Sequence, residues 1–246
     1  MSQFVQGTGL PKHVKVLITG PTSVGKTHSG LELPGPTAVW STEDGLNGFE
    51  DRFDFFSSYV DGVKDLIAKM KLILANKDGD LDRFRTFMLD SVTVPYQEAV
   101  RAYSNSKGMI DFKNQHQFQS DWKELMALIM KLGAKGKNVW ATAHAKHQWD
   151  TSGPKPVIVD VKPDMADRLG FAFDIIIYVD IIDGVRVAHG LKSRFPQVIK
   201  RGDTIENFSV STHFAPIFGN EFRKEKGIYV PVTAEGASQT VDTTLE

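Results

Sequence analysis

The stretch "VKVLITGPTSVGKT", residues 14–27, decides the fold class. Its first six residues form a short pattern typical of a buried strand, and a glycine-containing loop follows at once. From Gly20 to Thr27 the loop fits the pattern G-x-x-x-x-G-K-[S/T]. Glycines let such a backbone curl, so that successive N–H groups face phosphates at the positive end of the next helix. The sequence therefore predicts a nucleotide-binding loop between a strand and a helix.

Single positions of this loop have expected roles. Lys26 places a positive charge on the β- and γ-phosphates, and Thr27 offers its hydroxyl to Mg²⁺. The alternative is a glycine turn that contains Lys-Thr by chance, which the strand before the loop and the helix after it disfavour. The residues predicted to bind the nucleotide are Gly20, Pro21, Thr22, Ser23, Val24, Gly25, Lys26, Thr27 and His28.

Strand and helix patterns alternate along the rest of the chain. Further strands are predicted at 37–42, 84–90 and 138–144, and helices at 63–76 and 120–133. Asp121 with Glu124 fits a capping arrangement at the start of the second helix. This alternation predicts an α/β fold, with a mostly parallel central sheet flanked by helices.

The C-terminal part of the chain lacks this alternation of strand and helix patterns. Residues 174–192, "DIIIYVDIIDGVRVAHGLK", predict an antiparallel hairpin with Asp183-Gly184 as its turn. Residues 233–246 are polar and rich in threonine, which is typical of a loose tail. We therefore expect a single domain over residues 1–232, with a C-terminal antiparallel hairpin, followed by a flexible tail.

Composition narrows the class of protein. The chain has 246 residues, of which 41% are hydrophobic and 24% charged, as in ordinary globular proteins. A formal net charge of −1 gives no global signal for nucleic-acid binding. Because cysteine is absent, disulfides and thiolate metal sites are excluded. No apolar run reaches the ~18 residues of a membrane span, so we expect no membrane partner and a cytoplasmic location.

Two acidic residues at predicted strand ends complete the chemistry of the loop. "FMLDS" ends a strand in Asp90, where a carboxylate assists Mg²⁺, although Asp and Ser also serve as helix caps. "VWSTED" places Glu43 at the end of another strand, where it could polarise a water towards the γ-phosphate. Asp44 is the close competitor for that role, and the alternative for either acid is a solvated turn residue.

Two other classes of nucleotide-binding protein fit less well. In "ANKDGD" (75–80) a guanine-reading Asn-Lys-x-Asp is incomplete, because Gly79 occupies the fourth position and the segment precedes Asp90. A small nucleotide or metabolite kinase would require an arginine-rich lid, which the sequence does not show. Both are therefore disfavoured.

The order of the motifs resembles the RecA/RadA superfamily, and more narrowly the short phage-borne RecA-like ATPases associated with single-strand annealing and recombination. The resemblance covers roughly residues 12–201 and is carried by the phosphate loop, the strand that leads to Glu43, "FMLDSVT", "NVWATAH" and "LKSR". It implies ATP as the nucleotide, Glu43 as the acid that promotes hydrolysis and Asp90 as the acid associated with Mg²⁺. It also implies that His144 senses the γ-phosphate, at a position where these recombinases usually carry glutamine.

The segment "NVWATAHAKHQWD" (138–150) has three readings. A zinc site of His144, His147 and Asp150 would have at most three ligands, whereas structural zinc usually takes four. Side chains three apart on a strand also point to opposite faces, which disfavours that site. A plain surface loop remains an alternative for His147 and Asp150. For His144 we favour the sensor role.

Two predicted loops occupy the places of the superfamily's DNA-binding loops. The first spans 104–117 and carries Lys107 and Lys113; the second spans 145–156 and carries Lys146, Trp149 and Lys155. Lysines can neutralise phosphates, and a tryptophan can stack on an unpaired base. The alternative is that both are ordinary solvated connections and that the tryptophan packs against the protein.

"LKSRF" (191–195) carries the last candidate pair. Alternation along a strand places Lys192 and Arg194 on the same face. The resemblance to RecA-like assemblies suggests that this pair reaches the γ-phosphate bound by the adjacent subunit, in a ring or a filament. The alternative is a solvated strand face.

These observations predict an ATP-dependent, single-stranded-DNA-binding protein of recombination or annealing that forms homo-oligomers. A single-stranded-DNA-binding protein is a further expected partner, and the location would be the bacterial host cytoplasm if the chain is phage-encoded. An ATP-binding regulatory module that only oligomerises, without DNA activity, is the alternative, besides the kinase.

Overall fold

The computed structural model describes residues 13–106, 108–150, 152, 157–218, 222–225 and 228–231. Its central sheet has the strand order β3-β2-β4-β5-β1-β7-β8-β9, and β6 pairs with β5 outside this path. The strands are β1 (Lys15–Gly20), β2 (Thr37–Ser41), β3 (Phe55–Tyr59), β4 (Thr86–Asp90), β5 (Asn138–Asp150), β6 (Val157–Pro163), β7 (Ile175–Ile182), β8 (Val185–Ser193) and β9 (Thr204–Glu206).

The sheet is mostly parallel, as predicted. From β3 across to β7 every neighbouring pair is parallel, and β8 and β9 then continue the sheet in antiparallel pairing. The predicted hairpin turn is confirmed, since Asp183 and Gly184 connect β7 to β8 with φ of 51° and 78°. Two positive φ angles are what a tight two-residue hairpin turn requires.

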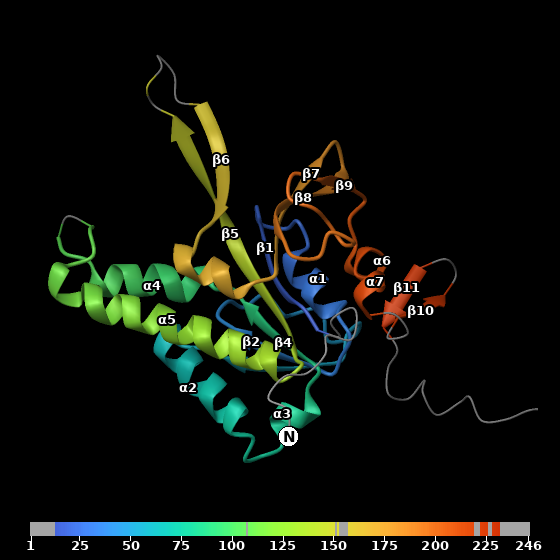
Figure 1. Cartoon of the computed structure of the whole chain (residues 1–246), viewed down its shortest axis with the longest axis horizontal. Helices are drawn as coiled ribbons and strands as arrows, with labels where there is room; N and C mark the ends of the chain where they lie inside the picture. Colours follow the sequence, from blue (N-terminus) through green and yellow to red (C-terminus); the bar gives the residue numbers. More distant parts are fainter. Residues whose placement is uncertain are drawn as a thin grey trace, which may run out of the picture.

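Helices cover both faces of the sheet (Figure 1). One face carries α2, α4 and α5, and the other carries α1, α6 and α7. The helices are α1 (Lys26–Leu31), α2 (Gly62–Ala75), α3 (Asp80–Arg83), α4 (Thr93–Tyr103), α5 (Phe112–Ala134), the 3₁₀ helix η1 (Asp167–Ala172), α6 (Val210–His213) and α7 (Ala215–Phe218). A separate two-stranded ribbon joins β10 (Phe222–Glu225) to β11 (Ile228–Pro231).

The position of β1 inside the sheet explains why residues 16–18 are apolar without a polar residue between them. Leu17 packs into the core beneath α2 and α5, whereas Val16 and Ile18 pack into the core beneath α1 and α6. All three side chains are fully buried. A parallel strand covered on both faces loses the alternation of apolar and polar residues. This double burial fixes the position of β1, and therefore of the phosphate loop at its end.

Helix α5 begins earlier than predicted. Asp111 caps it, because its side chain accepts a hydrogen bond from the backbone N–H of Lys113 at 3.0 Å. The predicted cap at Asp121 is wrong: this residue is buried within the helix and accepts a hydrogen bond from the Tyr103 hydroxyl at 3.0 Å. The first turns of α5 are mostly exposed, so they lack the apolar periodicity that would have revealed them.

Strand β5 is longer than predicted. It runs past His144 to Asp150, and its outer half pairs antiparallel with β6. Together they form an arm that projects from the sheet (Figure 1). The prediction of a loop over 145–156 is therefore wrong for residues 145–150, and the predicted loop over 104–117 is wrong for 112–117, which belong to α5.

The structure contains elements beyond those expected from the sequence. Strand β3 and helix α4 were not predicted from sequence, while the predicted tail at 233–246 lies outside the described residues. Within the described ranges, none of the helices combines the length and the apolar character needed to cross a bilayer.

Candidate functional site

The phosphate loop lies between β1 and α1, at the edge of the sheet where the parallel strands end. A side chain at Gly20 would place its Cβ 2.1 Å from the carbonyl oxygen of Val179, so only glycine fits beside β7. Gly25 has φ of 81°, in the left-handed region that favours glycine, immediately before α1. Both glycines of the motif are thus explained by the backbone path.

The side chain of Lys26 folds back onto the backbone of this loop. Its Nζ donates hydrogen bonds to the carbonyl oxygens of Gly20 at 3.0 Å and Pro21 at 2.5 Å. Burial lowers the pKa of Lys26, while the charges of Asp90 and Glu43 raise it in opposition. A partly desolvated ammonium group at the loop would attract phosphate oxygens more strongly than one in water.

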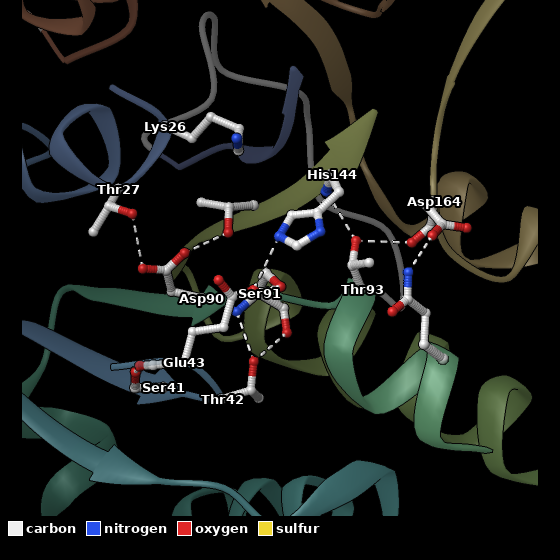
Figure 2. A network of polar contacts seen from close by, with 12 residues as sticks. Lys26, Thr27, Ser41, Thr42, Glu43, Asp90, Ser91, Thr93, His144 and Asp164 are labelled. Atoms are coloured by element: carbon white, nitrogen blue, oxygen red, sulfur yellow. Dashed lines mark hydrogen bonds and ion pairs between the residues drawn. The ribbon is translucent and has the colours of Figure 1, made fainter. Parts of the chain in front are cut away.

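Asp90 ends β4 beside the loop (Figure 2). Its two carboxylate oxygens accept hydrogen bonds from Thr27 Oγ1 at 2.9 Å and from Thr142 Oγ1 at 2.5 Å. Burial raises the pKa of Asp90, and these two hydrogen bonds oppose that effect. A hydroxyl and a buried carboxylate are hard oxygen donors of the kind that Mg²⁺ takes, so Thr27 and Asp90 fit a magnesium ion.

Glu43 contacts two side chains, one directly after β4 and one on β5 (Figure 2). Ser91 Oγ donates to Glu43 Oε1 at 2.6 Å, and His144 Nε2 lies 3.1 Å from the same oxygen. Asp44, the competitor, accepts a hydrogen bond from Asn47 at 2.8 Å instead. Of these two acids, Glu43 lines the cavity in front of the phosphate loop.

That cavity has a volume of about 400 Å³. It is lined by residues of the loop, of the segment after β2, of the end of β4 and of the middle of β5. Its lining residues are Thr22, Ser23, Gly25, Lys26, Thr27, His28, Glu43, Gly45, Phe49, Asp90, Ser91, Thr142 and His144. The structure thus brings six of the nine predicted loop residues together with Glu43, Asp90 and His144, whereas Gly20, Pro21 and Val24 are not among the lining residues.

Four cavity residues were missed by sequence reasoning, among them Gly45 in the segment between β2 and β3. Thr142 precedes His144 by two positions on one strand and therefore shares its face, which was an available signal. Ser91 directly follows Asp90, but a serine there also fits a helix cap. Phe49 belongs to the segment between β2 and β3, where no pattern distinguishes it.

Arg186 holds the end of the phosphate loop and the start of α1 through hydrogen bonds. Its guanidinium donates hydrogen bonds to the Gly25 carbonyl oxygen at 3.1 Å and to Ser29 Oγ at 2.5 Å. Burial lowers the pKa of Arg186. This residue sits on β8 and links the antiparallel part of the sheet to the start of α1. A single arginine in a strand carried no signal for this role.

Lys192 and Arg194 lie at the other edge of the sheet. Ser193, between them, pairs with Ile175, which lies beside the start of β1 rather than its loop end. Lys192 Nζ donates to the carbonyl oxygens of Gly170 at 2.9 Å and Phe173 at 2.7 Å. Arg194 Nη1 lies 3.3 Å from Asp174 Oδ1, and the arginine side chain is 61% exposed. The fold separates both from the phosphate loop of their own chain.

Of the three side chains in the zinc reading, that of Asp150 lies outside the described residues. The His144 ring faces Glu43, and His147 follows three positions later on the same strand. Among the described residues, no group of three histidine, cysteine, aspartate or glutamate side chains could hold a metal ion.

The predicted DNA-binding residues are only partly described. Lys113 lies in the first turn of α5, and Lys146 lies on the arm opposite Lys162. A second cavity, of about 360 Å³, opens at the base of the arm and is lined by Tyr96, Gln97, Val100, Arg101, Lys146 and Asp164. Lys107, Lys155 and the side chain of Trp149 lie outside the described residues.

Comparisons with known proteins bear on the family and the fold of the chain. The sequence model of a family described as an AAA domain matches residues 12–206. Among solved structures, the chain is similar to a crystal structure of the RadB recombinase, with a TM-score of 0.54 and 19% sequence identity, over 91% of this chain and 92% of that one. At this identity the likeness concerns the fold, and it confirms the predicted RecA-like arrangement. No curated protein matches the sequence.

Proposed function

Because the chain belongs to the AAA domain family and has a RecA-like fold, we propose that it is a magnesium-dependent ATPase that assembles on single-stranded DNA. We further propose that it promotes annealing or recombination there. The observation that carries the proposal is the convergence of Lys26, Asp90 and Glu43 on one cavity in front of the phosphate loop.

The proposed reaction is hydrolysis of the γ-phosphate. A water attacks the γ-phosphorus, the bond to the β–γ bridging oxygen breaks, and Glu43 accepts the proton that the water loses. Lys26 supplies positive charge to the phosphates as the leaving ADP gains negative charge. Thr27 and Asp90 would hold Mg²⁺, which when bound neutralises charge on the β- and γ-phosphates. The hydrogen bond of 2.9 Å between these two residues supports their common role.

His144 is the proposed sensor of the γ-phosphate. Its backbone N–H donates to Thr93 Oγ1 at 2.8 Å, and its carbonyl oxygen accepts from the N–H of Asp164 at 2.8 Å. Thr93 Oγ1 in turn donates to the Asp164 carbonyl oxygen at 2.8 Å. Asp164 directly follows β6, so these bonds join the nucleotide cavity to the base of the arm (Figure 2). They support a coupling between nucleotide state and the arm.

Single-stranded DNA is the proposed partner of the arm and the α4–α5 connection. Lys146 offers a cation on the arm, and Arg101 lines the same cavity at its base. Lys113, at the start of α5, adds a third cation. The sequence predicts that Lys107, Lys155 and Trp149 belong to the same DNA-binding surface. Cations along a groove and a stacking aromatic are the usual means of holding an unpaired strand.

Lys192 and Arg194 are proposed to act on a neighbouring subunit. Their distance from the loop edge of their own sheet supports this assignment, because only a second copy could bring a γ-phosphate to them. The working unit would then be a ring or a filament. A partner single-stranded-DNA-binding protein belongs to the same proposal.

One experiment tests the function directly: the ATPase rate with and without single-stranded DNA. We expect hydrolysis that rises when the strand is added. Transfer of phosphate to a small acceptor, without any response to DNA, would identify a kinase instead. ATP-dependent assembly without phosphate release would identify the regulatory module.

Trp149→Ala is expected to weaken binding of single-stranded DNA by about 1–3 kcal/mol, because base stacking on an aromatic ring contributes that much. Titrations with a labelled oligonucleotide at one fixed salt concentration measure it, since salt alone shifts such affinities. Trp122→Phe, a change in the buried core beneath α5, is the control for altered aromatic content. Wild-type affinity in Trp149→Ala would mean that this tryptophan packs against the protein.

His144→Ala is expected to abolish the difference in DNA affinity between two nucleotide states. In the unchanged protein, single-stranded DNA should bind more tightly with a non-hydrolysable ATP analogue than with ADP. The nucleotide can influence the arm only through contacts that differ between the two states, and His144 makes the proposed one. Full discrimination between the nucleotides in the variant would refute the sensor assignment.

A further inference from the structure

The carboxylate of Glu43 is anchored through one of its two oxygens. Oε1 accepts a hydrogen bond from Ser91 Oγ at 2.6 Å and lies 3.1 Å from His144 Nε2. Among the described residues, no group donates a hydrogen bond to Oε2. Glu43 is 41% exposed, so its side chain would have rotational freedom without these partners. The two contacts therefore select one orientation of the carboxylate.

The two partners are held very differently. Ser91 is buried, with 3% of its surface exposed, and its backbone is locked to Thr42. Thr42 Oγ1 accepts a hydrogen bond from the Ser91 N–H at 2.9 Å and donates one to the Ser91 carbonyl oxygen at 3.0 Å. Thr42 directly precedes Glu43 in the chain. The serine hydroxyl and the glutamate are thus fixed relative to each other by neighbouring residues.

The His144 ring is less constrained. Its side chain is 38% exposed, and its hydrogen bonds to Thr93 and Thr19 are made by its backbone N–H and carbonyl oxygen. Rotation of the ring would move Nε2 away from Glu43 without disturbing the strand. If the ring turns towards a γ-phosphate, as proposed above, it loses its contact with Oε1. Among the described residues, Ser91 then remains as the hydrogen-bond donor to Oε1.

We infer that Ser91 is a positioning residue for the proposed general base. Its hydroxyl fixes Oε1 of Glu43, which leaves Oε2 available to the attacking water. This inference rests on the proposed function and adds a residue to it. Ser91 takes no proton in the reaction and acts only through the orientation of Glu43.

Removal of the hydroxyl should therefore affect the chemical step and not nucleotide binding. In Ser91→Ala the carboxylate loses its fixed donor, and a misplaced catalytic group costs up to about 100-fold in rate. We expect kcat to fall by about 10- to 100-fold, while KM stays within about twofold, since binding of the phosphates is unchanged. The dissociation constant of a fluorescent ATP analogue and the melting temperature should match those of the unchanged protein.

Ser211→Ala is the matched control, because it removes another buried serine hydroxyl, in α6 and away from the cavity. Its kcat should equal that of the unchanged protein. If Ser91→Ala does not fold, the isosteric pair Ser91→Thr and Ser91→Val isolates the hydroxyl at constant volume. We then expect the threonine variant to turn over at least about tenfold faster than the valine variant, and equal rates would overturn the inference.

A double-mutant cycle with Glu43→Gln separates this inference from the proposed function. If Ser91 acts through Glu43, Ser91→Ala should cause no further loss of kcat in the Glu43→Gln background. An equal loss in both backgrounds, or a change confined to KM, would show that Ser91 does not act through Glu43. Normal turnover in Glu43→Gln alone would instead reject Glu43 as the base, and the proposed function would have to be revised first.

Discussion

Arg194→Ala is expected to lower the turnover of the assembled protein by about 10³–10⁵-fold, the contribution of an arginine that stabilises charge during phosphoryl transfer. ATP binding by a single subunit should remain nearly intact, because Arg194 lies at the edge of the sheet opposite the phosphate loop. Its 61% exposed side chain is free to contact a second subunit once it leaves Asp174. Steady-state hydrolysis at protein concentrations above and below assembly measures the effect.

Mixing subunits tests whether the arginine acts across an interface. Arg194→Ala subunits keep an intact phosphate loop, and Lys26→Ala subunits keep an intact Arg194. Mixed assemblies should therefore recover part of the activity, because some interfaces join one intact loop to one intact arginine. Arg201→Ala, at an exposed position in the turn after β8, is the control and should hydrolyse ATP normally. Absence of recovery, with both variants shown to co-assemble, would contradict action in trans.

Glu43→Gln should lower kcat by about 10²–10⁴-fold, the usual cost of losing a positioned general base. The amide keeps the shape of the side chain but cannot accept the proton of the attacking water. Binding of ATP should persist, because Lys26 and the loop backbone are unchanged. Single-turnover hydrolysis, together with titration of a fluorescent ATP analogue, separates these two expectations.

Asp44→Asn is the control for this assignment. The structure pairs Asp44 with Asn47 at 2.8 Å, whereas Glu43 lines the nucleotide cavity. Asp44→Asn should therefore retain normal turnover. The reverse result, with Glu43→Gln active and Asp44→Asn inactive, would move the base by one residue.

Much of the fold was predictable because its signals are local. The phosphate loop is a contiguous motif, and its strand and helix follow from residues 14–31 alone. The hairpin of β7 and β8 was likewise encoded in one segment, since Asp183-Gly184 adopts the positive φ angles of its turn. Where the local signal was weak, prediction failed: the exposed first turns of α5 and the outer half of β5 carry no continuous apolar stripe.

The residues of the candidate site also divide into those that the sequence could identify and those that only the structure reveals. Lys26, Thr27, Glu43, Asp90 and His144 could be nominated from sequence, because each follows or ends a recognisable strand. Their roles stay predictions. Ser91 could not be nominated as a partner of Glu43, since the two residues are 48 positions apart and meet only because β2 and β4 are neighbours.

The sequence by itself determined that the chain contains a phosphate loop and a mostly parallel α/β sheet, because a loop motif and double burial of strands leave a signature in consecutive residues. Only the tertiary structure decided which strand ends meet at the cavity. The order β2-β4-β5-β1 brings Glu43, Ser91 and His144 together, and the reversal of β8 carries Arg194 to the far edge. Strand order depends on packing between distant segments, which no local pattern records.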